Sequence, residues 1–344
     1  MVRRSAVAFG FVGYETRNVS RSNRNEGPIR IGVSACLLGH QVRYDGGHKR
    51  DAFVTETLGR FVEFVAVCPE VELGLGVPRE TLRLERRGDD IRDELRDDIR
   101  MIGNRSGQDY TMAMREYAER RLDDLARADL CGYILKQNSP SCGLEGVAIF
   151  GSPSAGRGRG LFAAALIRRL PLLPVEEESR LNDIPSRENF LERIFAYHRL
   201  RNFFRNRWTP PSLVSFHLTH ELQLLAHSPR SHRELSRLVH RASPGSELRL
   251  RYEMGFMRAM SRVATPARHV RVLRHIADAI RPYLEPSRRS ELDEATRDYH
   301  DGRFPLFVPI SLMRQYAQQF AIDYLKQQTY FEPYPIELMP QRSG

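Results

Sequence analysis

Short apolar runs alternate with amphipathic stretches in the first half of the chain, between residues 28 and about 171. Three of these runs have the composition of buried strands: Ile29–Ser34, Val62–Val67 and Leu130–Leu135. Apolar side chains recur at helical spacing over residues 107–129, between the second and third runs, whereas the Gly- and Ser-rich residues 151–160 predict a loop. Parallel strands need long connections that contain a helix. The alternation of predicted strands with a predicted helix therefore indicates an α/β domain, residues 28–183, with a parallel, Rossmann-like sheet.

The second half of the chain has apolar residues at helical spacing throughout. Prolines stand where helices would begin or end, at Pro210, Pro229, Pro244, Pro266 and Pro286. The predicted helices cover residues 187–206, 211–226, 230–242, 247–263, 266–283, 288–300 and 310–325. This pattern predicts an all-α C-terminal domain over residues 184–344. Residues 1–27 follow neither pattern, and we expect them to form a disordered N-terminal extension.

Composition excludes several classes of protein. Hydrophobic residues make up 41% of the 344 residues, which is enough for a folded core and excludes a disordered chain. No apolar run approaches the roughly 18–20 residues that cross a bilayer, so an integral membrane protein is excluded. With 4 cysteines and no convincing export signal, the chain is not expected to form a disulfide framework. We expect a cytoplasmic protein whose thiols stay reduced.

Positive charge is concentrated in the helical half. The formal net charge is +10, and residues 201–290 hold 17 Lys and Arg side chains against 6 Asp and Glu. Arginine-rich helices can contact phosphates, so RNA is a candidate partner of this region. No named nucleic-acid motif is present, and a solvated or internally paired surface is the alternative interpretation.

Three of the four cysteines follow directly after a predicted strand. Cys36 lies in SACLLG after the first strand, Cys68 in VCPE after the second and Cys142 in SPSCG after the third. Open parallel sheets bind ligands beyond the carboxyl ends of their strands, so these thiols could converge on one point. Thiolates select iron–sulfur clusters, zinc or copper(I), and three ligands leave a metal position open, as catalytic sites do. Cys131 lies at the start of the third strand, and we expect it in the core.

Longer segments around these cysteines resemble a known family. SACLLGHQVRYDGGHK, CPEVELGLGVPRE and GYILKQNSPSCG resemble the bacterial thiouracil desulfurases, and FHLTHELQLLAHSPRSHRELSRLVH and PLFVPISLMRQYAQQFAIDYL are similar to the YbgA-type domain often fused to them. The resemblance implies a [4Fe-4S] cluster held by Cys36, Cys68 and Cys142, with the fourth iron open to substrate sulfur. It also implies a reaction that converts a thiolated pyrimidine such as 2-thiouracil into uracil and sulfide.

Such a reaction needs a group that moves protons beside the metal. Glu70 directly follows the Cys68-Pro69 pair and is the first candidate, with a salt-bridged structural role as its alternative. Ser139 and Ser141 precede Cys142, and either hydroxyl could orient water or the ring carbonyl; we assign Ser141 to catalysis and Ser139 to substrate binding. Both could instead cap the local turn.

Charged residues near the same edge of the sheet are candidate substrate contacts. They are Asp45, Arg79 and Lys136. Asp45-Gly46 is also a common turn signal, which is the alternative reading of that aspartate.

A protein that binds nucleic acid or a protein partner, with a structural or sensing metal, is the alternative function. A structural metal site would need a fourth protein ligand, for which Cys131 and His48 are the nearest candidates. In the helical half, His217, His220 and Glu221 have a spacing that could ligate zinc. HLTHE is not the HExxH arrangement of metalloproteases, so packing is the favoured role of these histidines.

Overall fold

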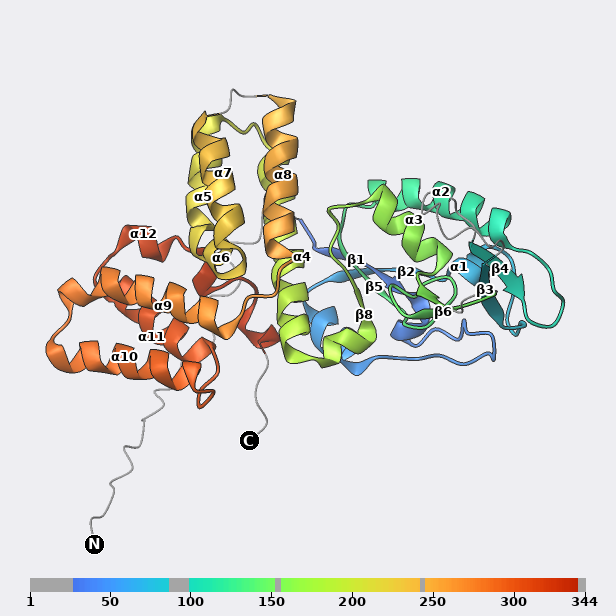
Figure 1. Ribbon diagram of the computed structural model, residues 1–344, viewed down its shortest axis with the longest axis horizontal. Coiled ribbons are helices and arrows are strands. Elements are labelled where there is room, and N and C mark those ends of the chain that lie inside the picture. The colour runs from blue at the N-terminus through green and yellow to red at the C-terminus, as the bar shows by residue number, and fades with distance from the viewer. Residues whose placement is uncertain (1–26, 87–98, 152–155, 242–244, 340–344) are drawn as a thin grey trace, which may run out of the picture.

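The computed structural model describes residues 27–86, 99–151, 156–241 and 245–339. It has an α/β part and a helical part, which one long helix, α4, connects (Figure 1). The predicted extension over residues 1–26 lies outside the described residues. None of the helices in the described ranges combines the length and the apolar composition that a membrane span requires.

A four-stranded parallel sheet forms the centre of the α/β part, in the order β2-β1-β5-β8. The strands are β1 (Arg30–Ser34), β2 (Glu63–Val67), β5 (Leu130–Leu135) and β8 (Val175–Glu177). Arg30 lies opposite Glu63 and Ser34 lies opposite Val67, so β1 and β2 end level with each other. The predicted parallel, Rossmann-like sheet is confirmed, and its first three strands lie within one residue of the predicted ranges.

A second, mixed sheet was not predicted from the sequence. Its order is β4-β3-β6-β7, with the strands β3 (Leu82–Arg86), β4 (Ile99–Gly103), β6 (Val147–Phe150) and β7 (Gly156–Gly158). Strand β7 has the sequence GRG and is held by backbone pairing to β6, where Ile149 lies opposite Gly156. The prediction of a loop over residues 151–160 is therefore wrong at residues 156–158. These residues form a strand because their backbone pairs with β6, and their side chains give no sign of it in the sequence. Residues 152–155 lie outside the described part of the chain.

Helices cover both faces of the parallel sheet. Two helices, α2 (Thr111–Arg127) and α3 (Leu161–Arg169), share one core with residues of both sheets. The first half of α4 (Ile184–Arg205) packs against the opposite face of the parallel sheet, where Ile194 joins Ile31 and Cys131 in one cluster. Cys131 is 3% exposed and lies in this core. The short helix α1 (Pro69–Glu72) follows β2, and a 3-10 turn (Ala35–Leu38) follows β1.

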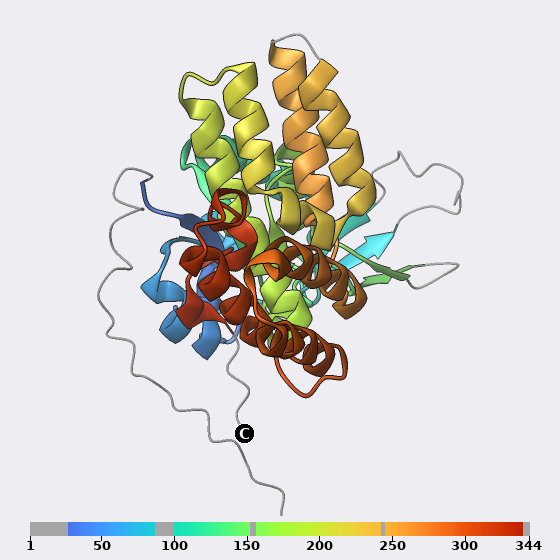
Figure 2. The ribbon, with the colours of Figure 1, turned by 90° about the vertical axis from the view of Figure 1, so that its left-hand side faces the viewer.

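The helical part confirms the all-α prediction. Its helices after α4 are α5 (Pro210–Thr219), α6 (Glu221–His227), α7 (Pro229–Arg241), α8 (Ser246–Met260), α9 (Pro266–Ile280), α10 (Pro286–His300), α11 (Phe307–Gln319) and α12 (Asp323–Lys326). Proline begins α5, α7, α9 and α10, because its missing N–H is not needed in the first turn of a helix. The predicted helix 211–226 is two helices that meet at His220, and α11 ends before Ala321, whose φ of 52° breaks the helix. Figure 2 shows α5, α7 and α8 upright above the layer of α9 to α11.

The two parts share a hydrophobic core. Besides the first half of α4, the end of the chain packs on the α/β part, since Tyr334 and Leu338 belong to the same cluster as Ile31. The Tyr334 ring lies 6.3 Å from the ring of Phe195 on α4. The helical part is thus attached to the α/β part by packing as well as by chain connectivity.

Substituting Gly132→Ala is expected to destabilise the protein by about 1–3 kcal/mol, as overpacking of a tight core does. A Cβ at this position would lie 2.6 Å from Cγ2 of Ile194 and 3.1 Å from Cδ1 of Ile31. Thermal unfolding of the variant should show this loss, whereas Gly156→Ala, where a Cβ meets nothing within 4 Å, should unfold like the parent protein. Equal unfolding midpoints for the two variants would contradict the tight contact between α4 and the sheet.

Candidate functional site

One cavity of about 390 Å³ lies at the carboxyl ends of β1, β2 and β5, and Cys36, Cys68 and Cys142 all line it. Cys36 and Cys142 are 8% and 6% exposed, and Cys68 is half-buried. Three segments that are far apart in the sequence therefore bring their thiols to the wall of one site. This is the edge of the sheet where parallel α/β folds bind their ligands.

The local structure of each loop fixes its cysteine. Cys36 lies in the 3-10 turn, and its carbonyl accepts hydrogen bonds from Lys49 N at 2.9 Å and from Gly39 N at 3.3 Å. Gly39 has a φ of 96°, a left-handed conformation that suits glycine and ends the turn. Cys68 directly precedes α1, and its N–H donates to Glu72 Oε1 at 3.1 Å. Hydrogen bonds thus hold the main chain of Cys36 and Cys68, and the Cys68 thiol lies 3.7 Å from the carbonyl of Val42.

The environment of the three thiols disfavours their charged form. Burial raises the pKa of Cys36 to about 11, with a further contribution from Cys68. Burial also raises the pKa of Cys68 and of Cys142, and nearby Glu70 adds to both shifts. A bound cationic centre reverses this effect, because a coordinating thiol is deprotonated. These buried side chains are therefore neutral thiols in the absence of a metal, and a bound metal would stabilise their thiolate form.

The donor set of the cavity consists of three thiols, which come from three separate loops. Thiolates are soft ligands that suit iron–sulfur clusters and zinc. Within the described ranges, no group of three or more His, Cys, Asp or Glu side chains is already arranged to hold one metal ion. Neither Cys131 nor His48 lines the cavity, so the structure brings no fourth ligand from the two predicted candidates.

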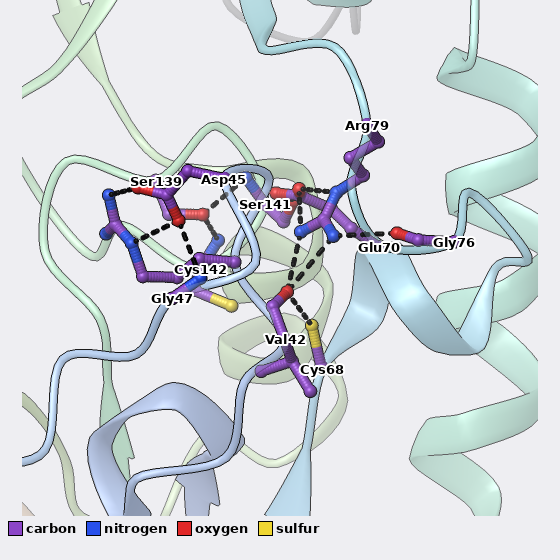
Figure 3. Close-up of polar contacts among 11 residues, drawn as sticks. Val42, Asp45, Gly47, Cys68, Glu70, Gly76, Arg79, Ser139, Ser141 and Cys142 are labelled. Carbon is purple, nitrogen blue, oxygen red and sulfur yellow. Dashed lines mark hydrogen bonds and ion pairs between the residues drawn. The ribbon is translucent and has the colours of Figure 1, made fainter.

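Glu70 and Arg79 form a largely buried ion pair in the wall of the cavity. Their side chains are 14% and 7% exposed, and Arg79 Nη2 lies 2.7 Å from Glu70 Oε2. Figure 3 shows the Arg79 guanidinium held in place by the carbonyls of Val42 and Gly76, each at 3.0 Å. The Ser141 hydroxyl donates to Glu70 Oε1 at 2.6 Å. Both oxygens of Glu70 are therefore oriented, and the carboxylate has a fixed position beside the cysteines.

The two serines before Cys142 have different surroundings. Ser141 is fully buried and does not line the cavity, so it contacts Glu70 rather than the open space. Ser139 lines the cavity, and its hydroxyl accepts hydrogen bonds from Ser141 N at 3.2 Å and Cys142 N at 3.1 Å. These bonds make Ser139 the cap of the turn that carries Cys142.

The predicted substrate contacts are only partly brought together. Arg79 and Lys136 line the cavity, and the Lys136 ammonium forms an ion pair with Glu178. Asp45 does not line it. The Asp45 carboxylate accepts a hydrogen bond from Gly47 N at 3.0 Å and pairs with Arg43, the pattern of a turn residue.

Two basic residues that line the cavity are not among the candidates that the sequence predicts. Arg43 and Lys49 line it together with Arg79 and Lys136, and Glu70 is the acidic residue of the lining. Both lie in the segment RYDGGHK that belongs to the first cysteine motif, and their charge could have singled them out. Three of these four cations are already ion-paired, Arg43 with Asp45, Arg79 with Glu70 and Lys136 with Glu178.

His217 and His220 of the helical part are buried, packed side chains. His217 contacts Tyr252 OH at 3.2 Å and Ser236 Oγ at 2.9 Å, and burial lowers its pKa to about 4. His220 Nδ1 lies 2.8 Å from the carbonyl of Phe216. Glu221 accepts a hydrogen bond from Tyr324 OH at 3.0 Å and lies 3.5 Å from His232 Nε2. These contacts favour packing over zinc binding.

Several arginines of α7 to α9 are exposed. Arg230, Arg249 and Arg251 form ion pairs with glutamates one helical turn away. Other exposed arginines have no ion pair with any described residue, namely Arg233, Arg237, Arg258, Arg262, Arg271 and Arg274. Helices α7 and α8, which carry Arg233, Arg237 and Arg258, pack side by side (Figure 1).

Comparisons with known proteins agree with this division of the chain. A family model described as 2-thiouracil desulfurase matches residues 31–178, and a model described as a protein of unknown function (DUF1722) matches residues 221–335. The uncharacterized protein YbbK of Bacillus subtilis (strain 168) is 32% identical over 155 residues, which are 44% of this chain and 97% of YbbK. The uncharacterized protein YbgA of Escherichia coli (strain K12) is 28% identical over 160 residues, 46% of this chain and 95% of YbgA.

A solved structure is also similar in sequence. It is titled a [4Fe-4S]-dependent thiouracil desulfidase, TudS, and is 33% identical, covering 45% of this chain and 94% of its own. The TM-score of the two structures is 0.35. The fold and the site define a two-part protein with three cysteines at the carboxyl edge of a parallel sheet. The chain belongs to the 2-thiouracil desulfurase family, and its helical part carries a DUF1722 domain of the YbgA type.

Proposed function

We propose that this protein is an enzyme that removes sulfur from a thiolated pyrimidine such as 2-thiouracil. In the balanced reaction, 2-thiouracil and water give uracil and hydrogen sulfide. The observation that carries the proposal is the cavity in which Cys36, Cys68 and Cys142 lie beside an oriented carboxylate, Glu70. The family of the α/β part supports the same class of reaction. A cytoplasmic location, where thiols stay reduced, is part of this proposal.

Cys36, Cys68 and Cys142 would hold a [4Fe-4S] cluster, and one of its irons would have no protein ligand. When bound, such a cluster supplies a soft Lewis acid for the thiocarbonyl sulfur of the substrate. The chain offers only three cysteines at this cavity, which matches an open position. Catalytic metal sites keep such a position, whereas structural sites fill it.

Glu70 would take a proton from the water that attacks the ring carbon and return it to the departing sulfur. Arg79 fixes one carboxylate oxygen by its hydrogen bond at 2.8 Å and so holds Glu70 in place. Ser141 acts through Glu70, because its hydroxyl contacts the carboxylate and does not line the cavity. Lys136 and Ser139 line the cavity and are the proposed substrate contacts, together with Arg79.

A direct assay tests the proposed reaction. The anaerobically reconstituted protein is incubated with 2-thiouracil, and uracil and sulfide are both quantified. We expect them in equal amounts, with no turnover by Cys36→Ser. A wild-type protein that holds its cluster yet leaves 2-thiouracil and other thiolated pyrimidines unchanged would contradict the proposal.

We further propose that the thiolated base is presented in an RNA strand bound by the helical part. The exposed arginines of α7 to α9 that have no ion pair with a described residue support this proposal. Phosphate contacts of arginines release counterions, so binding would weaken steeply with salt. A free thiolated base is the alternative substrate.

The double variant Arg233→Ala, Arg237→Ala is expected to bind RNA more weakly than wild type. The binding constant should also depend less steeply on salt, with the slope of its logarithm against the logarithm of the salt concentration smaller in magnitude by about 1 per lost phosphate contact. Gel-shift titrations with tRNA at several salt concentrations measure both effects. Arg251→Ala removes an arginine that pairs with Glu247 and is the matched control. Binding that is absent, or that does not depend on salt, would leave only the free base as substrate.

A further inference from the structure

A second cavity lies in the helical part, away from the cysteines. Its volume is about 730 Å³, and it is lined by residues at the ends of α4 and α5, by the segment after α12 and by Gly27. Small-molecule sites typically have about 300–1,000 Å³. The described residues of the lining include Arg199 and Arg205 and no acidic side chain, and Arg205 forms an ion pair with Asp129 outside the lining. Arg199 therefore supplies the positive charge that favours an anionic ligand.

One wall of the cavity is aromatic. The rings of Phe203 and Phe216 lie 4.8 Å apart, and Phe216 stacks on His220 at 4.2 Å. Burial, with a smaller contribution from Arg199, lowers the pKa of His220 to about 3. The imidazole is therefore neutral at physiological pH and extends the aromatic surface. Planar heteroaromatic rings bind to such surfaces by stacking.

The other wall is polar and fixed in place. Arg199 donates to His220 Nε2 at 3.3 Å and to the carbonyl of Pro333 at 2.9 Å, which orients its guanidinium at the cavity. Asn206 and Asn202 also line the cavity, and Asn206 Nδ2 donates to the Asn202 carbonyl at 2.9 Å. Amide side chains offer both donors and acceptors to the edge of a base, and arginine suits phosphate.

We propose that this cavity binds a nucleotide, with the base on the surface of Phe203 and Phe216 and the phosphate at Arg199. Stacking surface, amide groups and cation together match the three parts of this ligand, whereas phosphate alone would leave the aromatic wall without a partner. The nucleotide is either free or part of an RNA strand. This inference does not depend on the desulfurase proposal, because none of these residues belongs to the cysteine cavity.

Trp208 provides a local reporter. It is the one tryptophan of the chain, it lies two residues after Asn206, and its ring packs at 5.3 Å on Phe204. Titration of the full-length protein with uridine 5′-monophosphate is followed by Trp208 fluorescence, with excitation outside the absorption of uracil. We expect saturable quenching of Trp208 fluorescence in the wild-type protein. The affinity for the nucleotide should be at least tenfold lower in Arg199→Gln and in Asn206→Ala. Arg251→Ala, which removes a similar charge from α8, should bind like wild type.

Each result of this experiment decides the proposal. No quenching by the nucleotide, equal affinity in wild type and both cavity variants, or equal competition by ribose 5-phosphate would overturn it. Thermal unfolding identifies a variant that fails to fold, in which case the other variant carries the comparison. A uridine hexanucleotide that binds at least tenfold more tightly, with the same dependence on Arg199 and Asn206, would identify the strand as the source of the nucleotide. Equal or weaker binding of the hexanucleotide would identify the free nucleotide.

Discussion

Glu70→Gln is expected to lower kcat for 2-thiouracil by about 10²- to 10⁴-fold, the usual contribution of a general acid or base. The amide has nearly the size of the carboxylate; its oxygen can still accept a hydrogen bond from Arg79, and its NH2 group can donate to the Ser141 hydroxyl, which now lies 2.6 Å from the other carboxylate oxygen. It cannot take a proton at neutral pH. The variant should therefore keep its cluster, as judged by visible absorption and iron content, and lose turnover.

Glu63→Gln is the matched control for this variant. Glu63 is an exposed residue of β2 that pairs with Arg30 at the opposite end of the strand from Cys68. Its substitution should leave both the cluster and kcat unchanged. Full activity of Glu70→Gln would instead make the ion pair between Glu70 and Arg79 purely structural, and the proton would have to move through another group of the cavity.

Cys142→Ser is expected to abolish activity and cluster binding together. A serine hydroxyl does not replace the soft thiolate that iron–sulfur clusters require, and two remaining cysteines would leave two irons without a protein ligand. Visible absorption after anaerobic reconstitution and the 2-thiouracil assay measure the two losses on the same sample.

Cys131→Ser distinguishes loss of a ligand from loss of packing. Cys131 is as buried as Cys142, at 3% against 6% exposed, but lies in the core on the face covered by α4. The Cys131 thiol lies 3.9 Å from the carbonyl of Asp129, which is too far for a good hydrogen bond from a hydroxyl. A buried hydroxyl that lacks such a bond costs about 1–3 kcal/mol of stability. We expect this variant to unfold at lower temperature yet to bind the cluster. Equal loss of the cluster in both variants would contradict the assignment of Cys142 as a ligand.

Much of the α/β fold could be predicted because its central strands are continuous apolar runs. Every residue of β5 is buried, and such a strand is visible in sequence without any partner. Strands β3 and β7 were missed for the opposite reason. The LRLER sequence of β3 mixes charge with apolar residues, and GRG in β7 is a strand only because β6 pairs with it. Long-range pairing of this kind leaves little local signal.

The site shows the same division between local and long-range information. The position of each cysteine after a strand was enough to predict that the thiols could converge, because parallel strands end at one edge of the sheet. The contact between Ser141 and Glu70 joins residues 71 positions apart, and nothing in either segment predicts it. Asp45 was assigned by proximity in sequence, yet its carboxylate binds its own turn. Motifs identify which residues are near the site, and only the fold shows which of them face it.

Iron and acid-labile sulfide per chain, measured on the anaerobically reconstituted wild-type protein, test the central claim that Cys36, Cys68 and Cys142 hold a cluster. The account predicts about four of each per chain. Little iron with about one tightly bound zinc would contradict it. The cavity would then be a structural metal site, and the desulfurase proposal would have to be given up for this chain.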